Sequence, residues 1–293
     1  MSSLLDPKIL LAIKDLSLAA RTTIEGFMSG INRSSVRGEG LEFSQYRSYQ
    51  PGDDLRQLDW KAYARSDRYY IRESQVETSI SVRFLVDASA SMLHEDNGYT
   101  KMKYAKYLAA SLAWLSALQG DAVGLYILQN NGVYTLQPRR GYQHMANLYY
   151  QLENTNASGG LTGAVEYRNI FSAAGKRELL VFITDLYEYN DELMNILAQL
   201  SVMKNEIIVF HLMGNNELNF DFGAYTNLQD LETGAVVKIN KGDSGYKEKL
   251  TAYLANTRMK MLQQHIFYRL INMRDSVDQA LRDFLQQRTK LIL

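Results

Sequence analysis

Two apolar segments that each end in an aspartate constrain the fold of this chain most strongly. SVRFLVD covers residues 81–87, and ELLVFITD covers residues 178–185. Both are almost continuously apolar, which is typical of strands buried on both faces of a parallel sheet. Helical patterns separate them from further strands, among them DAVGLYIL (121–128) and EIIVFHLM (206–213). The sequence therefore predicts an α/β fold built on a doubly wound, mostly parallel sheet.

The composition of the chain changes near residue 80. Residues 32–75 hold a dense mixture of Arg, Asp, Gly and Tyr, whereas strands alternating with helices follow from Ile80 onward. We expect residues 1–79 to form an N-terminal helix and a small irregular or β-rich subdomain. We expect residues 80–293 to form the α/β domain with a C-terminal extension of helices and a strand.

Charge and cysteine content exclude several classes of protein. Lys plus Arg and Asp plus Glu both number 32, so no net charge favours nucleic acid or an anionic membrane. The absence of cysteine excludes disulfides and thiolate ligands.

The amino terminus predicts an amphipathic helix beginning near Asp6, with Lys14 and Asp15 among its apolar residues, rather than a signal peptide. The longest nearly apolar run, 108–118, is about half of the ~20 residues that a bilayer span needs. We expect no transmembrane segment and a cytoplasmic location.

Polar residues follow both of the strands that end in aspartate. Asp87, Ser89 and Ser91 alternate in the stretch DASAS, and Thr162 follows two glycines in SGGLTGAVEY. Because the carboxyl ends of parallel strands meet at one edge of a sheet, Asp87 and Asp185 should lie there, and Thr162 can reach the same edge. Hydroxyls with one or two carboxylates suit Mg²⁺ or Mn²⁺, and the lack of histidines at ligand spacing argues against zinc. The alternative is that DASAS is only a strand end followed by a helix cap.

This predicted metal-ligand set resembles the metal-ion-dependent adhesion site of von Willebrand factor type A domains. The resemblance spans roughly residues 80–240 and rests on Asp87, Ser89, Ser91, Thr162 and Asp185. It implies a Rossmann-type fold in which both serines bind the ion directly and both aspartates act mostly through water. Thr162 would bind directly or through water, and a carboxylate of a partner would complete the coordination. One departure from the usual pattern is Leu161, which separates Thr162 from Gly160.

A second resemblance covers nearly the whole chain. It is carried by GEGLEFSQYRSYQPGDDLRQLDWKAYARSDRYYIRE (38–73) and by LQDLETGA (228–235), which are similar to the family called domain of unknown function 58. This resemblance implies a prokaryotic protein encoded beside an AAA+ ATPase of the MoxR group. The implied role is that of an adaptor or cofactor in the remodelling or maturation of client proteins.

The acidic residues of the upstream signature have three interpretations. Asp53, Asp54 and Asp59 alternate with arginines, which favours ion pairs that hold irregular backbone in place. An interaction surface is the functional alternative. Catalytic carboxylates are disfavoured, because no histidine is nearby and the arginines would keep the carboxylates ionised.

The leading hypothesis is therefore a non-enzymatic, metal-dependent protein-binding module. The chain has no phosphate-binding G-x-x-x-x-G-K-[ST] motif and no G-x-S-x-G motif of a serine hydrolase. A metal-dependent hydrolase is the alternative, with Asp185, Glu166 or His94 as the candidate general base. A third hypothesis keeps the fold and leaves the metal site empty.

Overall fold

The chain separates into two compact units, Met28–Thr78 and the remainder, which comprises residues up to Phe27 and from Ser79 on. The structure is a computed structural model that describes residues 13–35, 46–49, 60, 63, 65, 69–72, 79–129, 132–160, 178–187, 192–202, 205–221, 227–232, 234–238 and 244–292. Residues 1–12, where the N-terminal helix was expected to begin, lie outside that part of the chain.

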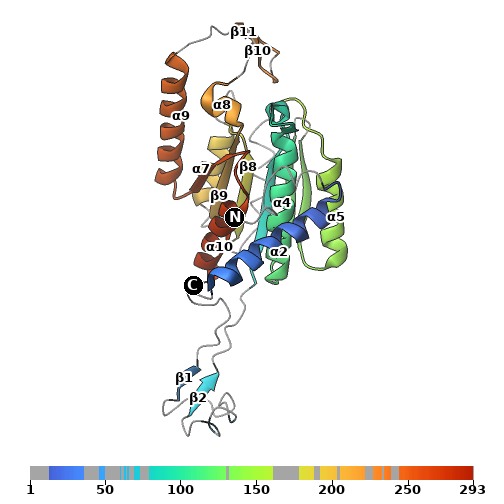
Figure 1. Cartoon of the computed structure of the whole chain (residues 1–293), viewed down its shortest axis with the longest axis vertical. Helices are drawn as coiled ribbons and strands as arrows, with labels where there is room; N and C mark the ends of the chain where they lie inside the picture. The colour runs from blue at the N-terminus through green and yellow to red at the C-terminus, as the bar shows by residue number, and fades with distance from the viewer. Residues whose placement is uncertain are drawn as a thin grey trace. The chain divides into compact units, whose positions relative to one another are not determined.

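A six-stranded sheet forms the centre of the larger unit (Figure 1). Its strands are β3 (Ser81–Asp87), β6 (Ala122–Gln129), β7 (Gly132–Arg139), β8 (Leu179–Thr184), β9 (Glu206–Met213) and β12 (Phe267–Asn272). Their order across the sheet is β12-β9-β8-β3-β6-β7, and every neighbouring pair is parallel except β6 and β7. Numbered along the chain this is the order 3-2-1-4-5-6 of doubly wound folds. The predicted fold class is therefore confirmed.

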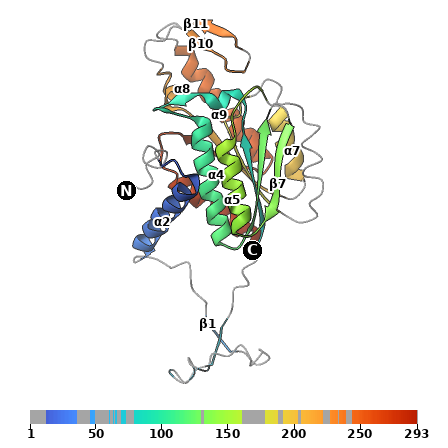
Figure 2. The same cartoon turned by 90° about the vertical axis from the view of Figure 1, so that its right-hand side faces the viewer.

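Helices cover both faces of the sheet. They are α2 (Leu16–Ser35), α4 (Lys101–Leu118), α5 (Tyr142–Asn154), α7 (Glu192–Val202), α9 (Ser244–Gln263) and α10 (Asp278–Ile292). In Figure 2, α4 and α5 lie on one side of the strands and α7 lies on the other. No helix in the described residues combines the length and the hydropathy needed to cross a bilayer.

The central strand β3 shows why these apolar runs form a sheet that is buried on both faces. Phe84 points to one face, where its ring stacks on Phe284 of α10 with centroids 6.2 Å apart. The next residue, Leu85, points to the other face and packs in a cluster with Leu193 and Leu197 of α7. Because successive side chains of a strand alternate between faces, only a continuous apolar run can fill both layers.

The edge strand β7 departs from this pattern. Its exposure alternates along its length, and Pro138 lies near its end. A proline cannot donate a hydrogen bond to a neighbouring strand, so it is tolerated at a sheet edge. The strand extends from Gly132 to Arg139 and so places Pro138 at this outer edge.

The first part of α2 belongs to the larger unit. Asp15 caps the helix, because its Oδ1 accepts a hydrogen bond from the Leu18 N–H at 2.9 Å. Ile24 and Phe27 are buried, and the guanidinium of Arg282 in α10 lies 5.5 Å from the centre of the Phe27 ring. The expected division put the whole helix in residues 1–79; in the structure its residues up to Phe27 group with the larger unit, and the smaller unit begins at Met28.

Several short helices and hairpins lie at the carboxyl edge of the sheet. They are a 3₁₀ helix, η3 (Ala90–Leu93), the hairpin β4 (Glu95–Asp96) and β5 (Tyr99–Thr100), α8 (Asn215–Asn219), and the hairpin β10 (Asn227–Gln229) and β11 (Val236–Lys238). Figure 1 shows β10 and β11 beyond the same end of the sheet as α8.

In the smaller unit, β1 (Tyr46–Ser48) pairs antiparallel with β2 (Tyr70–Arg72). The rings of Tyr63 and Tyr69 stack with centroids 4.5 Å apart, and Trp60 beside them is 62% exposed. Asp53, Asp54 and Asp59 of the signature lie outside the described residues.

Candidate metal centre

The candidate site lies where the sheet reverses its winding direction. Asp87 is the last residue of β3, and Asp185 directly follows β8, the neighbouring strand. The chain leaves β3 through α4 toward β6 on one side, and leaves β8 through α7 toward β9 on the other. Loops diverge at such a switch point and leave room for ligands beyond the strand ends.

The DASAS loop is a tight turn held by its own first side chain. Asp87 Oδ1 accepts a hydrogen bond from the Ser89 N–H at 2.9 Å. Backbone of a neighbouring loop fixes the two alanines, because Ala88 O accepts from Ser158 N at 2.9 Å and Ala90 N donates to Gly159 O at 2.6 Å. Ala88 is fully buried, so a larger side chain would not fit between these contacts.

Hydroxyl and carboxylate groups from both strand ends form one connected chain. Ser89 Oγ and Ser91 Oγ are 2.9 Å apart, and Ser91 Oγ donates to Asp185 Oδ1 at 3.0 Å. Asp87, Ser89 and Ser91 are all buried, as is Asp185. The structure thus brings together four of the five residues that the sequence singled out. The fifth, Thr162, lies outside the described residues.

Thr184 supports Asp87 from the adjacent strand, and the sequence analysis missed it. Its Oγ1 donates to Asp87 Oδ2 at 2.7 Å and accepts from the Leu186 N–H at 3.0 Å. Both carboxylate oxygens of Asp87 therefore accept a hydrogen bond from the protein itself. The sequence signal for this contact was the position of Thr184, a hydroxyl residue directly before Asp185 at the end of the strand.

A buried lysine is the second feature that the sequence analysis missed. Lys101, at the start of α4, is 3% exposed, and its Nζ donates to Asp185 Oδ2 at 2.9 Å and to Glu217 Oε1 at 2.8 Å. Burial alone would lower the pKa of Lys101, but the charges of Asp185 and Glu217 outweigh that effect and raise the pKa. The ammonium is therefore charged at neutral pH.

The charge balance of the site favours a further cation. Burial raises the pKa of Asp87 to about 6, and the neighbouring Asp185 charge adds to the rise, while hydrogen bonds from Thr184 and Ser89 oppose it. Lys101 is shared between Asp185 and Glu217, so it offsets only part of the negative charge. A divalent ion beside Asp87 would relieve the remaining repulsion.

A further carboxylate, Glu232, reaches this region from the β10–β11 hairpin, and it was not among the residues predicted from the sequence. Burial raises the pKa of Glu232 to about 7, with further contributions from Asp185, Asp87 and Asp230 and an opposing hydrogen bond with Ser91. Its Oε1 is buried and accepts no hydrogen bond from the described residues. Glu232 lies in the segment LQDLETGA, which the sequence analysis related to a family without assigning it to the metal site. That family resemblance was the one sequence signal that pointed to this residue.

The donor atoms fit a hard divalent cation. Hydroxyl and carboxylate oxygens are the ligands that Mg²⁺ and Mn²⁺ prefer. Among the described residues, no three His, Cys, Asp or Glu side chains converge closely enough to bind an ion together. An ion at this site would therefore need the Ser89 and Ser91 hydroxyls among its ligands.

A cavity of about 560 Å³ adjoins the site on the α9 side. Its lining includes Lys101, Asp185, His211, Glu217 and Tyr253. Burial lowers the pKa of His211 to about 4, so the imidazole is neutral at pH 7, and its Nδ1 is 2.7 Å from the Tyr268 hydroxyl. The acidic and basic side chains that line the cavity are the Lys101, Asp185 and Glu217 cluster and Lys260.

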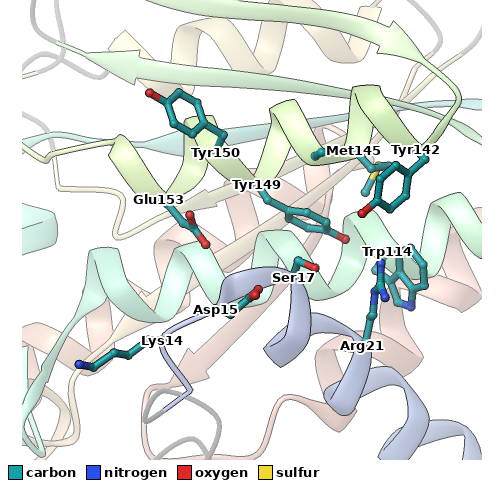
Figure 3. A pocket seen from close by; sticks show the side chains of 11 residues that line it. Lys14, Asp15, Ser17, Arg21, Trp114, Tyr142, Met145, Tyr149, Tyr150 and Glu153 are labelled. Atoms are coloured by element: carbon teal, nitrogen blue, oxygen red, sulfur yellow. The ribbon is translucent and has the colours of Figure 1, made fainter.

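A second cavity, of about 430 Å³, lies away from the site between α2, α4 and α5 (Figure 3). In this view Arg21 lies beside Trp114, below Tyr142 and Tyr149. The guanidinium carbon of Arg21 is 4.9 Å from the centre of the Trp114 ring. No candidate metal ligand lines this cavity.

The family described as "Protein of unknown function DUF58" matches residues 45–260, a span that contains DASAS, Asp185 and the β10–β11 hairpin. The chain belongs to this family. Two similar proteins are Uncharacterized protein Rv1480 of Mycobacterium tuberculosis and Uncharacterized protein Mb1516 of Mycobacterium bovis. Each is 25% identical over 234 residues, covering 79% of this chain and 73% of the relative.

Solved structures that resemble the chain include the conserved hypothetical protein BatB from Bacteroides thetaiotaomicron. It has a TM-score of 0.49 and 16% identity, covering 73% of this chain and 98% of BatB. The VWA domain of SpRpn10 has a TM-score of 0.39 and 10% identity, covering 72% of this chain and 95% of that domain. The fold class itself rests on the strand order and the helix placement of this chain.

Proposed function

We propose that this chain is a non-enzymatic, metal-dependent protein-binding module. The observation that carries the proposal is the connected set of oxygen donors from Asp87, Ser89, Ser91 and Asp185 at the switch point of the sheet. Ser89 and Ser91 would hold Mg²⁺ or Mn²⁺ directly, and Asp87 and Asp185 would act through water. Thr162 remains the fifth proposed ligand. The ion would supply a concentrated positive charge that attracts a carboxylate of a partner protein.

The proposed partners follow from the family resemblance of the sequence. They are a MoxR-type AAA+ ATPase and a client protein that offers the carboxylate, with the chain as adaptor or cofactor in remodelling or maturation of that client. An ATP-driven partner would place the chain in the cytoplasm.

The test is capture of partners from the native cell with and without a chelator. We expect the wild-type chain to retain an AAA+ ATPase or its client only when Mg²⁺ is present, and Asp87→Ala and Ser89→Ala to retain neither. Ser201→Ala is the matched control, because it makes the same change in α7, where Ser201 Oγ donates only to the Ala198 carbonyl. Equal capture by all four chains, or capture that ignores the chelator, contradicts the proposal.

A metal-dependent hydrolase is the second candidate, and the geometry leaves it a single described base. Asp185 is engaged by Lys101 and Ser91, and His94 Nε2 is 2.9 Å from Asn216 Oδ1. Glu166 lies outside the described residues. Glu232, with a pKa of about 7 and an oxygen that accepts no hydrogen bond from described residues, keeps the hydrolytic alternative open. Turnover of phosphoester or peptide substrates with Mn²⁺ that is lost in Glu232→Gln would favour this candidate.

A further inference from the structure

The turn that joins β10 to β11 holds Glu232 in a fixed backbone position. Asp230 Oδ1 accepts from the Glu232 N–H at 2.9 Å, and Asp230 O accepts from the Gly234 N–H at 2.8 Å. Gly234 has a φ of +74°, a left-handed conformation that favours glycine. Leu231 on the same turn is 45% exposed, so it faces solvent while the adjacent Glu232 turns a buried oxygen inward.

The Glu232 carboxylate lies against the loop that supports DASAS. A Cβ placed on Gly160 would be 3.5 Å from Glu232 Oε2, which is ordinary van der Waals contact. Gly160 follows Gly159, whose carbonyl accepts from the Ala90 N–H at 2.6 Å. The hairpin therefore delivers its carboxylate to the loop that fixes the alanines between the proposed ligands.

Glu232 is partly buried, and no positive charge from the described residues compensates its carboxylate. Its Oε1 is buried without a hydrogen bond from the described residues, and Asp87 and Asp185 are near enough to repel the carboxylate, while a hydrogen bond with Ser91 offsets only part of this repulsion. An ionised group in such surroundings is unfavourable unless a cation or a donor compensates it. Lys101 does not do so, because its ammonium is bound between Asp185 and Glu217.

We propose that Glu232 is itself a ligand of the divalent ion and fills the coordination position that a partner's carboxylate would otherwise take. This inference rests on the proposed function, since it requires an ion at Ser89 and Ser91. The resting chain would thus bind its own acidic turn, and an acidic partner would have to displace the β10–β11 turn. A ligand that must compete with a tethered one binds more weakly than it would at an open site.

The experiment measures Mn²⁺ binding to the full chain in two ways: the affinity, from the spin-resonance signal of free Mn²⁺, and the rate at which bound Mn²⁺ relaxes water protons. We expect Glu232→Ala to weaken Mn²⁺ binding by about 10-fold or more, the size of effect that losing groups around protein metal sites has. Bound Mn²⁺ in that variant should relax water protons faster, because water replaces the carboxylate. Added acetate should reverse this gain.

Controls separate failure of this inference from failure of the proposed function. Glu248→Gln makes the same change as Glu232→Gln at an exposed position on α9 and should leave both readouts unchanged. Glu232→Gln keeps the side-chain shape, so it stands in if Glu232→Ala does not fold. Wild-type affinity and relaxation in both Glu232 variants, with binding still lost in Ser89→Ala, would overturn the inference alone. No Mn²⁺ uptake by the wild-type chain, or full uptake by Ser89→Ala, would overturn both.

Discussion

The ammonium of Lys101 donates to Asp185 Oδ2 at 2.9 Å, in the interior of the protein and next to the proposed metal ligands. The same ammonium binds Glu217 from α8. A permanent positive charge is thereby built into the switch point of the sheet. It compensates part of the carboxylate charge, so Asp185 is oriented toward Ser91 without help from an ion.

Lys101→Met should destabilise the chain. It leaves the buried Asp185 carboxylate and the partly buried Glu217 carboxylate without their cation, and breaking one partner of a buried ion pair costs about 3–5 kcal/mol. Because Mg²⁺ would then supply the missing charge, Mg²⁺ should stabilise this variant more than it stabilises the wild-type chain. Urea unfolding with and without Mg²⁺ measures both effects. Lys103→Met, at an exposed position of the same helix, is the control. Equal effects of the two substitutions would contradict the role assigned to Lys101.

Asp87→Asn should stabilise the metal-free chain at neutral pH. The pKa of Asp87 rises from 3.8 to about 6 on folding, so the folded state binds this proton more tightly than the unfolded state does. Stability is therefore lost as pH rises from about 4 through 6. A shift of this size corresponds to an advantage on the order of 2–3 kcal/mol for the variant at pH 7.5, which should vanish near pH 4.

The measurement is urea unfolding in chelator across this pH range, with exposed Asp275→Asn as the control. Asp185 and Glu232 interact with Asp87 and remain in the variant, so some pH dependence should persist. Addition of Mg²⁺ at pH 7.5 should reverse the order, because only the wild-type chain gains the ion. A variant less stable than wild type in chelator at every pH would show that Asp87 stabilises the fold through its hydrogen bonds alone.

Arg288→Ala should destabilise the fold without touching the metal site. Arg288 Nε and Nη2 donate to Asp121 at 2.6 and 2.7 Å, and Asp121 also accepts from the Ile80 N–H at 3.1 Å. This ion pair ties α10 to the amino ends of β3 and β6, opposite the proposed ligands. Loss of the arginine leaves Asp121 buried and unpaired, at about 3 kcal/mol or more. Thermal unfolding should show the loss while Mn²⁺ affinity is unchanged; a matching loss of affinity would mean that the two sheet edges are coupled.

Local pattern was enough to predict the doubly wound sheet and the proximity of Asp87, Ser89, Ser91 and Asp185. The strands are continuous apolar runs, and parallel strands end at a common edge whatever the details of packing. The helix 101–118 was also predictable, because Thr100 caps it and its interior is apolar. These features depend on neighbours in the sequence and on general rules of sheet geometry.

The supporting groups could not be read from the sequence, because they are determined by long-range packing. Lys101 meets Asp185 and Glu217, which are 84 and 116 positions away. One local signal existed: a lysine in the first turn of a helix opposes the helix dipole, and such an inconsistency often marks a functional contact. Glu232 reaches the site only because the β10–β11 hairpin follows β9 to the same edge of the sheet.

The central claim is that Ser89 and Ser91 bind a divalent ion. Calorimetric titration of the full chain with Mg²⁺ tests it most directly, with Ser201→Ala as the matched control and the double variant Ser89→Ala, Ser91→Ala as the probe. We expect saturable uptake by the wild-type chain and by the control, and no uptake by the double variant. Uptake that survives in the double variant, or is absent from the wild-type chain, would contradict the account.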